Sequence, residues 1–417
     1  MKYTLAEIAD INKFSISKSD NLQEIIYLDT SSITENFISG TCTMPLPEAP
    51  SRAQRKVKST TIVYSTVRPR LKHYGILNSP PYNLIVSSGF VTIDLKKEYE
   101  DRIDARYLFL LLTQPAITEY IACIADSAVS AYPSFNPSDI SEIAFSFPNI
   151  EKQKAISEIW SNFEQKISIN RQINDNLEAM AKQLYDYWFV QFDFPNEEGK
   201  PYKSSGGVMV WNEKLKREIP QGWNVMSLGD YAPCKGGYAF KSKDFGNIGL
   251  PVIKIGNIQE NYTLDMTNCE CINGFANPLF IAKQYDLVIA MTGATIGKFA
   301  VSERNYLVNQ RVGRFELGEH PLKRLGYLFN SLKQDYFREQ VFQIASGCAQ
   351  PNISGEQIDS ISMLSPDKQI IEKYNILCES LLMQQNNCIL QSIELTKQRD
   401  ELLPLLMNGQ VSVNYHL

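Results

Sequence analysis

Residues 62–72 are IVYSTVRPRLK, an apolar strand pattern leading into a basic loop, and residues 287–298 are LVIAMTGATIGK, a similar strand leading into a polar loop. Further segments match in the same order: SSGFV at 87–91 with VNQRV at 308–312, YLF at 107–109 with YLF at 327–329, and AYP at 131–133 with AQP at 349–351. The separation stays at roughly 220 residues. Ordered matches at one long period predict a tandem duplication.

Each half is predicted to be an α+β module of mixed α/β content followed by a long helix. Short strand patterns bounded by Gly, Pro, Ser and Asn favour this class over a doubly wound sheet. A connector separates the halves, because residues 192–207, FDFPNEEGKPYKSSGG, are polar and rich in Gly and Pro. The predicted parts are a first module at 1–148, a spacer helix at 149–190, the connector at 191–222, a second module at 223–366, a second spacer helix at 367–408 and a tail at 409–417.

The first spacer helix is predicted from Ile156 to about Trp188, because apolar residues recur there at the alternating spacing of a coiled-coil seam. The seam positions are Ile156, Trp160, Phe163, Ile167, Leu177, Ala181, Leu184 and Trp188, with Asn170 and Asn174 between them. A buried Asn costs stability and fixes the register of a coiled coil.

The second helix is predicted from Gln369 to about Leu403, with Pro404 and Gly409 ending it. Its apolar stripe is Ile370, Tyr374, Leu377, Leu381, Cys388, Leu395 and Leu402, interrupted by Gln384, Gln391 and Gln398. The two stripes have matching length, one in each repeat, so the simplest way to bury both is against each other. That pairing predicts two long antiparallel coiled-coil helices with a pseudo-two-fold axis.

The net charge of −5 and the pI of about 5.5 mean that any nucleic-acid surface must be local. The segment Ala49–Ile93 contains no Asp or Glu. Its cations are Arg52, Arg55, Lys56, Lys58, Arg68, Arg70 and Lys72, accompanied by His73. Such segregation of charge predicts contacts with DNA phosphates. A solvated loop with incidental basic residues is the alternative.

Two short motifs are similar to enzyme motifs. Residues 293–299, GATIGKF, have three residues between the glycines where a nucleotide-binding P-loop has four, and Phe299 where that loop has Ser or Thr. Residues 79–82, SPPY, are similar to the tetrapeptide that holds the target amino group in amino-methyltransferases, but no strand ending in a Gly-rich cofactor turn accompanies them. A tight loop beside DNA and a proline-stiffened loop beside the basic segment are the preferred interpretations.

Taken together, these segments closely resemble the specificity (S) subunit of type I restriction-modification enzymes over nearly the whole chain. The most specific elements are FDFPNEEGKPYKSSGG at 192–207, IPQGW at 219–223, TGATIGK with the later VNQR, STVRPRLK with the later SSGF, and LYDYWF at 184–189. The first module departs from the pattern, since it lacks a Trp-containing lead like the one at Trp223. How its opening is closed is therefore left open.

The resemblance implies a non-catalytic, cytoplasmic subunit whose modules at 1–148 and 223–366 are target-recognition domains, each recognising half of a split double-stranded DNA sequence. The helices would act as a spacer and ruler. Two methyltransferase subunits that use S-adenosylmethionine would dock on the helices, and motor-nuclease subunits that use ATP and Mg²⁺ would join for restriction. The chain itself is expected to bind no cofactor, metal or membrane and to carry no catalytic residue.

Candidate DNA-binding residues come from the basic segment and from the loops of both repeats. Arginine suits the edge of guanine, and Asn and Gln suit adenine, while other cations and hydroxyls suit phosphates. The candidates are Arg52, Arg55, Lys56, Lys58, Thr66, Arg68, Arg70, Lys72, His73, Ser88, Lys254, Asn257, Thr292, Thr295, Lys298, Asn309, Gln310 and Arg311. A packed role for His73 and a strand end satisfied by its own amides at 309–311 are the alternatives.

Two other functions remain as alternatives. An autonomous DNA methyltransferase or nuclease would need a cofactor pocket or a carboxylate-rich nuclease motif, and binding of S-adenosylmethionine by the isolated chain would support the methyltransferase. A scaffold that binds only proteins through its coiled coil leaves the acid-free segment unexplained. That scaffold predicts no salt-sensitive DNA binding.

Overall fold

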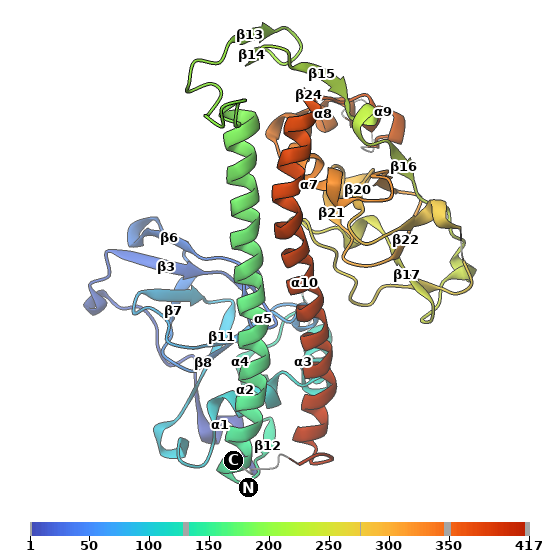
Figure 1. Cartoon of the computed structure of the whole chain (residues 1–417). Helices are drawn as coiled ribbons and strands as arrows, with labels where there is room; N and C mark the ends of the chain where they lie inside the picture. The colour runs from blue at the N-terminus through green and yellow to red at the C-terminus, as the bar shows by residue number, and fades with distance from the viewer. Residues whose placement is uncertain (1, 128–132, 276, 346–351, 413–417) are drawn as a thin grey trace. The chain divides into compact units, whose positions relative to one another are not determined.

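The computed structural model describes residues 2–127, 133–275, 277–345 and 352–412 (Figure 1). The chain divides into two compact units, one of Met1–Gln165 with Leu395–Leu417 and one of Lys166–Glu394. Each unit therefore contains one module and a stretch of both long helices. Of the matching AYP and AQP segments, Ala131, Tyr132 and all of AQP lie outside the described residues.

The module of the first unit contains two four-stranded sheets. One has the strand order β2 (Ala9–Ile11), β11 (Phe90–Leu95), β8 (Thr61–Ser65), β9 (Tyr74–Leu77), and the other has the order β6 (Cys42–Pro45), β3 (Glu24–Leu28), β10 (Leu84–Ser87), β7 (Ala53–Lys56). Strands β3 and β10 run parallel, and the other neighbours run antiparallel. The first and last strands, β1 (Lys2–Thr4) and β12 (Ala144–Ser146), pair antiparallel. This ladder closes the opening of the module.

Short helices and one hairpin complete the first module: α1 (Leu5–Ile8), α2 (Ala105–Leu112), α3 (Pro115–Ser127), α4 (Pro137–Ser141), and β4 (Ile33–Thr34) with β5 (Phe37–Ile38). Helix α2 begins where the Asp104 carboxylate accepts a hydrogen bond from the backbone N–H of Tyr107. Its buried face enters the main core, and Leu406 from the second long helix packs into the same core. Among the described residues no single helix is long and apolar enough to cross a membrane, although α2 and α3 together, bent at their junction, match by length and composition.

The module of the second unit has the same plan. Its sheets have the strand orders β16 (Cys234–Gly236), β23 (Val312–Phe315), β20 (Leu287–Ala290), β21 (Phe299–Val301) and β18 (Cys271–Ile272), β17 (Leu250–Ile253), β22 (Tyr306–Val308), β19 (Ile281–Ala282). Its helices are α6 (Leu228–Tyr231), α7 (Leu322–Leu332), α8 (Asp335–Ala345) and α9 (Gly355–Asp359). Strands β17 and β22 run parallel, as β3 and β10 do. Strands β15 (Asn224–Ser227) and β24 (Ser362–Ser365) close this module, as β1 and β12 close the first. The predicted duplication of an α+β module is confirmed.

The two long helices, α5 (Ile150–Tyr185) and α10 (Lys368–Met407), pack antiparallel, as predicted. Within the second unit, the Asn170 amide donates to the Ser392 hydroxyl at 3.3 Å, and the Tyr374 hydroxyl donates to the Ala181 carbonyl at 3.2 Å. Residue numbers thus rise on one helix as they fall on the other. Asn170 is 8% exposed, which confirms the prediction of a polar residue in the seam.

The predicted seam of the first helix is confirmed, and the predicted stripe of the second helix is buried or half-buried at every position except Leu377, where the prediction is wrong. Every predicted seam residue of α5 is buried or half-buried, whereas Leu377 of α10 is 49% exposed. The next residue, Cys378, is fully buried, and the buried face continues through Leu382 and Asn386. Adjacent apolar residues at 376–378 and 381–382 offer two stripes, and spacing alone does not choose between them.

Pro404 does not end the second helix, contrary to the prediction. Helix α10 continues to Met407, with Pro404 in its last turn. Proline there removes one N–H donor, and the carbonyl of Pro404 still accepts a hydrogen bond from the N–H of Asn408 at 3.0 Å. Gly409, with φ of 71°, follows in the left-handed conformation that commonly terminates helices.

The segment between the modules contains more regular structure than its polar composition predicts. A π-helical turn at Asp186–Val190 follows α5, and β13 (Met209–Asn212) pairs with β14 (Arg217–Pro220) in a hairpin. The ring of Phe194 stacks on those of Tyr202 and Trp223, with centroid distances of 4.8 and 4.7 Å. Aromatic packing therefore orders this part of the chain.

Candidate nucleic-acid interface

The loop that follows β8 and the loop that follows β20 have the same length and the same backbone frame. In the first, the N–H of Ser65 donates to the carbonyl of His73 at 2.8 Å. In the second, the N–H of Ala290 donates to the carbonyl of Lys298, also at 2.8 Å. We call residues 66–72 and 291–297 the first and second recognition loops. Each contains one 3₁₀ turn, Pro69–Leu71 in the first and Gly293–Thr295 in the second.

Left-handed residues occupy equivalent places in the two loops. Arg68 has φ of 48° and Gly293 has φ of 74°; Lys72 has φ of 56° and Gly297 has φ of 80°. Glycine adopts this conformation without a steric penalty, whereas a residue with a β-carbon is strained there by about 1 kcal/mol or more. The first loop therefore carries strain that the second loop avoids.

The segments before α4 and α9 hold the two loops in the same way. In the first unit the N–H of Phe135 donates to the carbonyl of Thr66 at 3.1 Å, and in the second the N–H of Ile353 donates to the carbonyl of Met291 at 2.9 Å. Isolated β-bridges join Val67 to Ser134 and Thr292 to Asn352. These attachments fix each loop on its module.

A strand-to-strand turn lies beside each recognition loop and brings several candidates together. In the first module the N–H of Thr66 donates to Gly89, and the N–H of Ser88 donates to the carbonyl of Arg52 at 2.7 Å. In the second, the N–H of Met291 donates to the carbonyl of Arg311 at 3.0 Å, and the N–H of Asn309 donates to that of Ile253 at 3.1 Å. The structure thus gathers Arg52, Thr66 and Ser88 in one module, and Lys254, Thr292, Asn309, Gln310 and Arg311 in the other.

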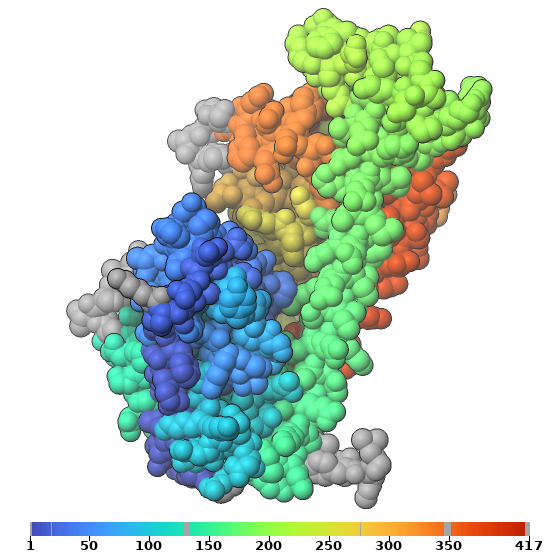
Figure 2. Space-filling view, turned by 90° about the vertical axis from the view of Figure 1, so that its left-hand side faces the viewer, coloured from blue at the N-terminus to red at the C-terminus, as the bar shows by residue number. Residues whose placement is uncertain are grey.

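The acid-free segment, which is drawn in the lighter blues of Figure 2, forms ion pairs with carboxylates from elsewhere in the first module. Lys56 pairs with Asp20 and Lys72 with Glu35, both at 2.5 Å. Arg70 contacts Glu119 and Asp126 of α3, each at 2.7 Å. These hydrogen bonds raise the pKa of the Arg70 guanidinium, and those to Glu119 lower the pKa of its carboxyl. The cations of this segment are therefore separated from acidic residues along the sequence but not in the folded module.

Arg52 and Lys58 differ from those cations. No carboxylate among the described residues pairs with either of them, and both are exposed. The Lys58 ammonium lies 5.7 Å from the centroid of the Phe14 ring. These two side chains are available to phosphates without breaking an ion pair.

Two other candidates of the first module brace neighbouring backbone. The Arg55 guanidinium donates to the carbonyl of Asn12 at 3.2 Å and to the hydroxyl of Ser15 at 3.3 Å. The Nδ1 atom of His73 lies 2.7 Å from the carbonyl oxygen of Ile33, an acceptor, so the proton is on Nδ1. These contacts give both residues a packing role.

In the second module the candidate lysines are paired as well. Lys298 pairs with Glu260 at 3.0 Å, and Lys254 pairs with Glu270 while its ammonium lies 4.2 Å from the centroid of the Phe245 ring. The remaining polar candidates hold backbone: the Asn257 side chain accepts from the N–H of Lys254 at 2.7 Å and donates to the carbonyl of Asp265 at 2.8 Å, and the Thr295 hydroxyl donates to the carbonyl of Thr292 at 3.4 Å. Gln310 and Arg311 are exposed at the turn.

The sequence did not indicate which acids would neutralise the basic segment. Glu35, Glu119 and Asp126 lie far from their partners along the chain, on the β4–β5 turn and on α3. Helix α3 presents both of its acids to the recognition loop. A search for acidic residues on one face of that helix could have suggested the contact, because Glu119 and Asp126 are two turns apart.

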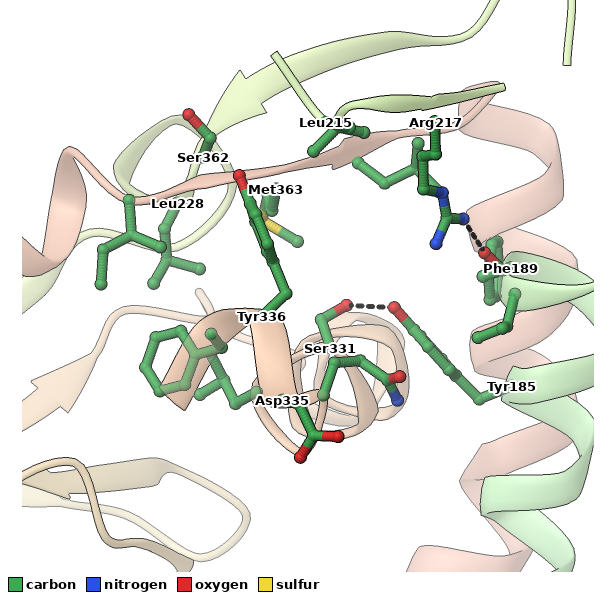
Figure 3. Close-up of a pocket in the computed structure, with 16 residues that line it drawn as sticks. Tyr185, Phe189, Leu215, Arg217, Leu228, Ser331, Asp335, Tyr336, Ser362 and Met363 are labelled. Carbon is green, nitrogen blue, oxygen red and sulfur yellow. Dashed lines mark hydrogen bonds between the residues drawn. The ribbon is translucent and has the colours of Figure 1, made fainter. Parts of the chain in front are cut away.

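A cavity of about 290 Å³ lies elsewhere in the second unit, between the end of α5, the β13–β14 hairpin and α8 (Figure 3). Two contacts hold its walls: the Tyr185 hydroxyl lies 3.1 Å from that of Ser331, and the Arg217 guanidinium donates to the carbonyl of Phe189 at 2.9 Å. Burial raises the pKa of Tyr185 to about 12. The cavity touches neither recognition loop.

Comparison with known proteins connects this geometry to a family. The family model of the type I restriction modification DNA specificity domain matches residues 1–179 and 220–389. These two ranges correspond to the two repeats, each with part of its following helix. The match covers most of the chain.

Individual relatives align over most of their length. The chain is similar to the specificity subunit of the type I restriction enzyme HindI of Haemophilus influenzae, with 23% identity over 93% of this chain and 94% of that protein. It is also similar to the MjaIX specificity subunit of Methanocaldococcus jannaschii, with 25% identity over 84% of this chain and 77% of that protein. The fold is similar to that of the S subunit of a type I restriction-modification system from M. genitalium, with a TM-score of 0.57 and 16% identity over 97% of this chain and 95% of that chain.

Proposed function

The chain belongs to the type I restriction-modification DNA specificity family, and we propose on that basis that it recognises a bipartite DNA sequence, one half with each module. As a specificity subunit it supplies sequence recognition, and partner subunits carry out the chemistry. The observation that supports the bipartite target is the repetition of the whole module together with its recognition loop. Two equivalent loops on two modules suit two half-sites.

We assign the candidate residues three kinds of role. Arg52 and Lys58 are exposed without a carboxylate partner among the described residues, so they contact phosphates. Lys72, Arg70, Lys254 and Lys298 form solvent-exposed ion pairs, which are weak, so a phosphate can compete for these cations. The other exposed side chains of the recognition loops and those of the 309–311 turn face base edges. Arg55, Lys56, His73 and Asn257 support the surface.

The partners follow from the family. We propose that methyltransferase subunits, two in the complete enzyme, dock on the long helices, and that motor-nuclease subunits join them in the cytoplasm. S-adenosylmethionine and ATP with Mg²⁺ are then cofactors of those partners. The outward faces of the helices carry exposed apolar side chains that could pack against another protein, among them Ile173 and Met180 on α5 and Ile376 on α10.

Methylome sequencing tests this proposal. The full chain is expressed with its partner subunits in cells that lack other methyltransferases, and methylated positions are mapped across the genome. The expected result is one motif made of two short defined sequences separated by unspecified bases. A single continuous motif would contradict recognition by two modules. Absence of any motif from cells in which the complex assembles would contradict the function itself.

A further inference from the structure

We propose that Arg68 is the specificity-determining residue of the first recognition loop, and that its guanidinium recognises one guanine of the half-site. This inference rests on the proposed function and deepens it. It is carried by the equivalence between Arg68 and Gly293, together with the bidentate geometry of the guanidinium.

The equivalence of the two positions is set by hydrogen bonds and not by sequence similarity. The pairs Ser65 to His73 and Ala290 to Lys298 close loops of equal length, and Phe135 and Ile353 attach them at the same point. Within that frame, Arg68 and Gly293 hold the same left-handed place. The backbone therefore requires a positive φ there, whichever residue is present.

Glycine is the residue that meets this requirement without strain, and the second loop has it. The first loop has an arginine, which is among the residues that seldom adopt this conformation. A strained residue persists where the surrounding structure holds it, and such residues concentrate at functional sites. Glycine would adopt this backbone conformation with less strain than arginine. The presence of arginine at this position is therefore explained by what its side chain does.

The backbone of Arg68 is held on both sides. Its N–H donates to the carbonyl of Pro133 at 2.9 Å, and its carbonyl accepts from the N–H of Leu71 at 2.9 Å. Val67, the preceding residue, is bridged to Ser134. The exposed side chain of Arg68 thus projects from a fixed point. A planar guanidinium on a fixed backbone suits the bidentate contact with the O6 and N7 atoms of guanine, which is sensitive to direction.

The other two cations of the loop form exposed ion pairs with the module, for which a phosphate can compete. Arg70 contacts two carboxylates of α3, and Lys72 contacts Glu35 of the β4–β5 turn, so both tie the loop to the module. Lysine also lacks the bidentate fork. Of the two residues that this loop holds in the left-handed conformation, Arg68 and Lys72, only Arg68 has the planar guanidinium that can make a bidentate contact.

The variant Arg68→Gly tests the assignment, because it introduces the residue that the second loop carries at this place and so preserves the backbone. The assembled complex is tested against duplexes that carry the methylated motif and against every single-base substitution of the first half-site. Wild type should discriminate at each defined position. The variant should lose discrimination at one G·C pair, by about 5- to 150-fold, and keep it elsewhere.

Two matched variants serve as controls. Thr60 also has a positive φ, 68°, and lies at the opposite end of β8 from the loop, so Thr60→Gly relieves comparable strain and should leave discrimination unchanged. Lys72→Gly removes a cation and left-handed strain within the same loop. It should weaken binding to all sequences about equally and lower the slope of affinity against salt.

The outcomes separate the inference from the proposed function. If wild type recognises a bipartite motif and Arg68→Gly keeps discrimination at every position, Arg68 does not determine specificity. A uniform loss of affinity with a reduced salt slope would instead make Arg68 a phosphate contact, and the inference would again be wrong. If wild type itself shows no bipartite motif, the proposed function has failed before Arg68 is tested.

Discussion

At the scale of single residues, a buried carboxylate on β11 combines two unfavourable features. Asp94 is 1% exposed, and its Oδ1 atom accepts a hydrogen bond from the Thr61 hydroxyl at 2.5 Å. Its Oδ2 atom is buried and has no hydrogen-bond partner among the described residues. Burial raises the pKa of Asp94, because removal from water disfavours the charged form.

Replacing Asp94 by Asn should therefore make the free energy of unfolding less dependent on pH. A carboxyl whose pKa is raised in the folded protein binds a proton more tightly in the folded state than in the unfolded state. Its contribution to the free energy of unfolding is therefore complete below the pKa of the unfolded state, and it is lost as pH rises through the pKa of the folded state. Urea unfolding of wild type and Asp94→Asn is measured between pH 5 and 8. As pH rises, the free energy of unfolding of Asp94→Asn should increase relative to that of wild type. Asp101→Asn, at an exposed position, is the control. Parallel curves for wild type and Asp94→Asn would refute the assignment.

At the scale of the element, the second helix offers a comparison between two neighbouring stripes. Leu382 is 6% exposed and belongs to the main core of its unit, whereas Leu377 is 49% exposed. Leu382→Ala should destabilise the chain by about 2–4 kcal/mol, since it leaves a cavity. Leu377→Ala should change stability by no more than about 0.5 kcal/mol. Chemical denaturation of both variants measures the difference, and a larger loss for Leu377→Ala than for Leu382→Ala would mean that the helix is packed on the other face.

The same helix shows what a periodic pattern can and cannot predict. Long helices, their pairing and the duplicated module follow from features spread over many residues, so local exceptions do not change the conclusion. The face that α10 buries depends on which of two adjacent apolar residues, such as Leu377 and Cys378, meets the partner, and both fit the same spacing. The ordered connector was missed because its aromatic rings contact one another across intervening polar residues.

At the scale of the whole molecule, the candidate interface could be predicted as loops but not as individual contacts. The loops after β8 and β20 were identified from sequence, and they do share one backbone frame. The partners of Arg70 and Lys72 could not be predicted, because α3 and the β4–β5 turn approach the loop only in the folded module. Ion pairs between distant segments depend on tertiary structure, which charge counts along the chain do not contain.

Exchange of one module should change one half of the target. Replacing residues 223–366 with the corresponding module of another family member should alter one defined half of the methylated motif and preserve the other, because each module carries its own recognition loop. Methylome sequencing of the chimera provides the measurement, and the unmodified chain in the same host is the control. A chimera that assembles but alters both halves would show that the modules do not recognise DNA independently.

The pairing of the first and last strands of each module, β1 with β12 and β15 with β24, also has a consequence for genetic recombination. The pairing of Asn224 with Ser365 brings together residues whose codons stand at opposite ends of a long stretch of the gene. Two recombination breakpoints near those codons would therefore place both chain junctions side by side at this ladder. The ladder itself consists of backbone hydrogen bonds, which tolerate many side chains. The module also packs against α5 and α10 through residues such as Tyr185, Tyr327 and Tyr374, so an incoming module must keep that buried face. A single genetic exchange that preserves this face can thus replace an entire module, whereas a series of point mutations would have to keep the core intact at each step.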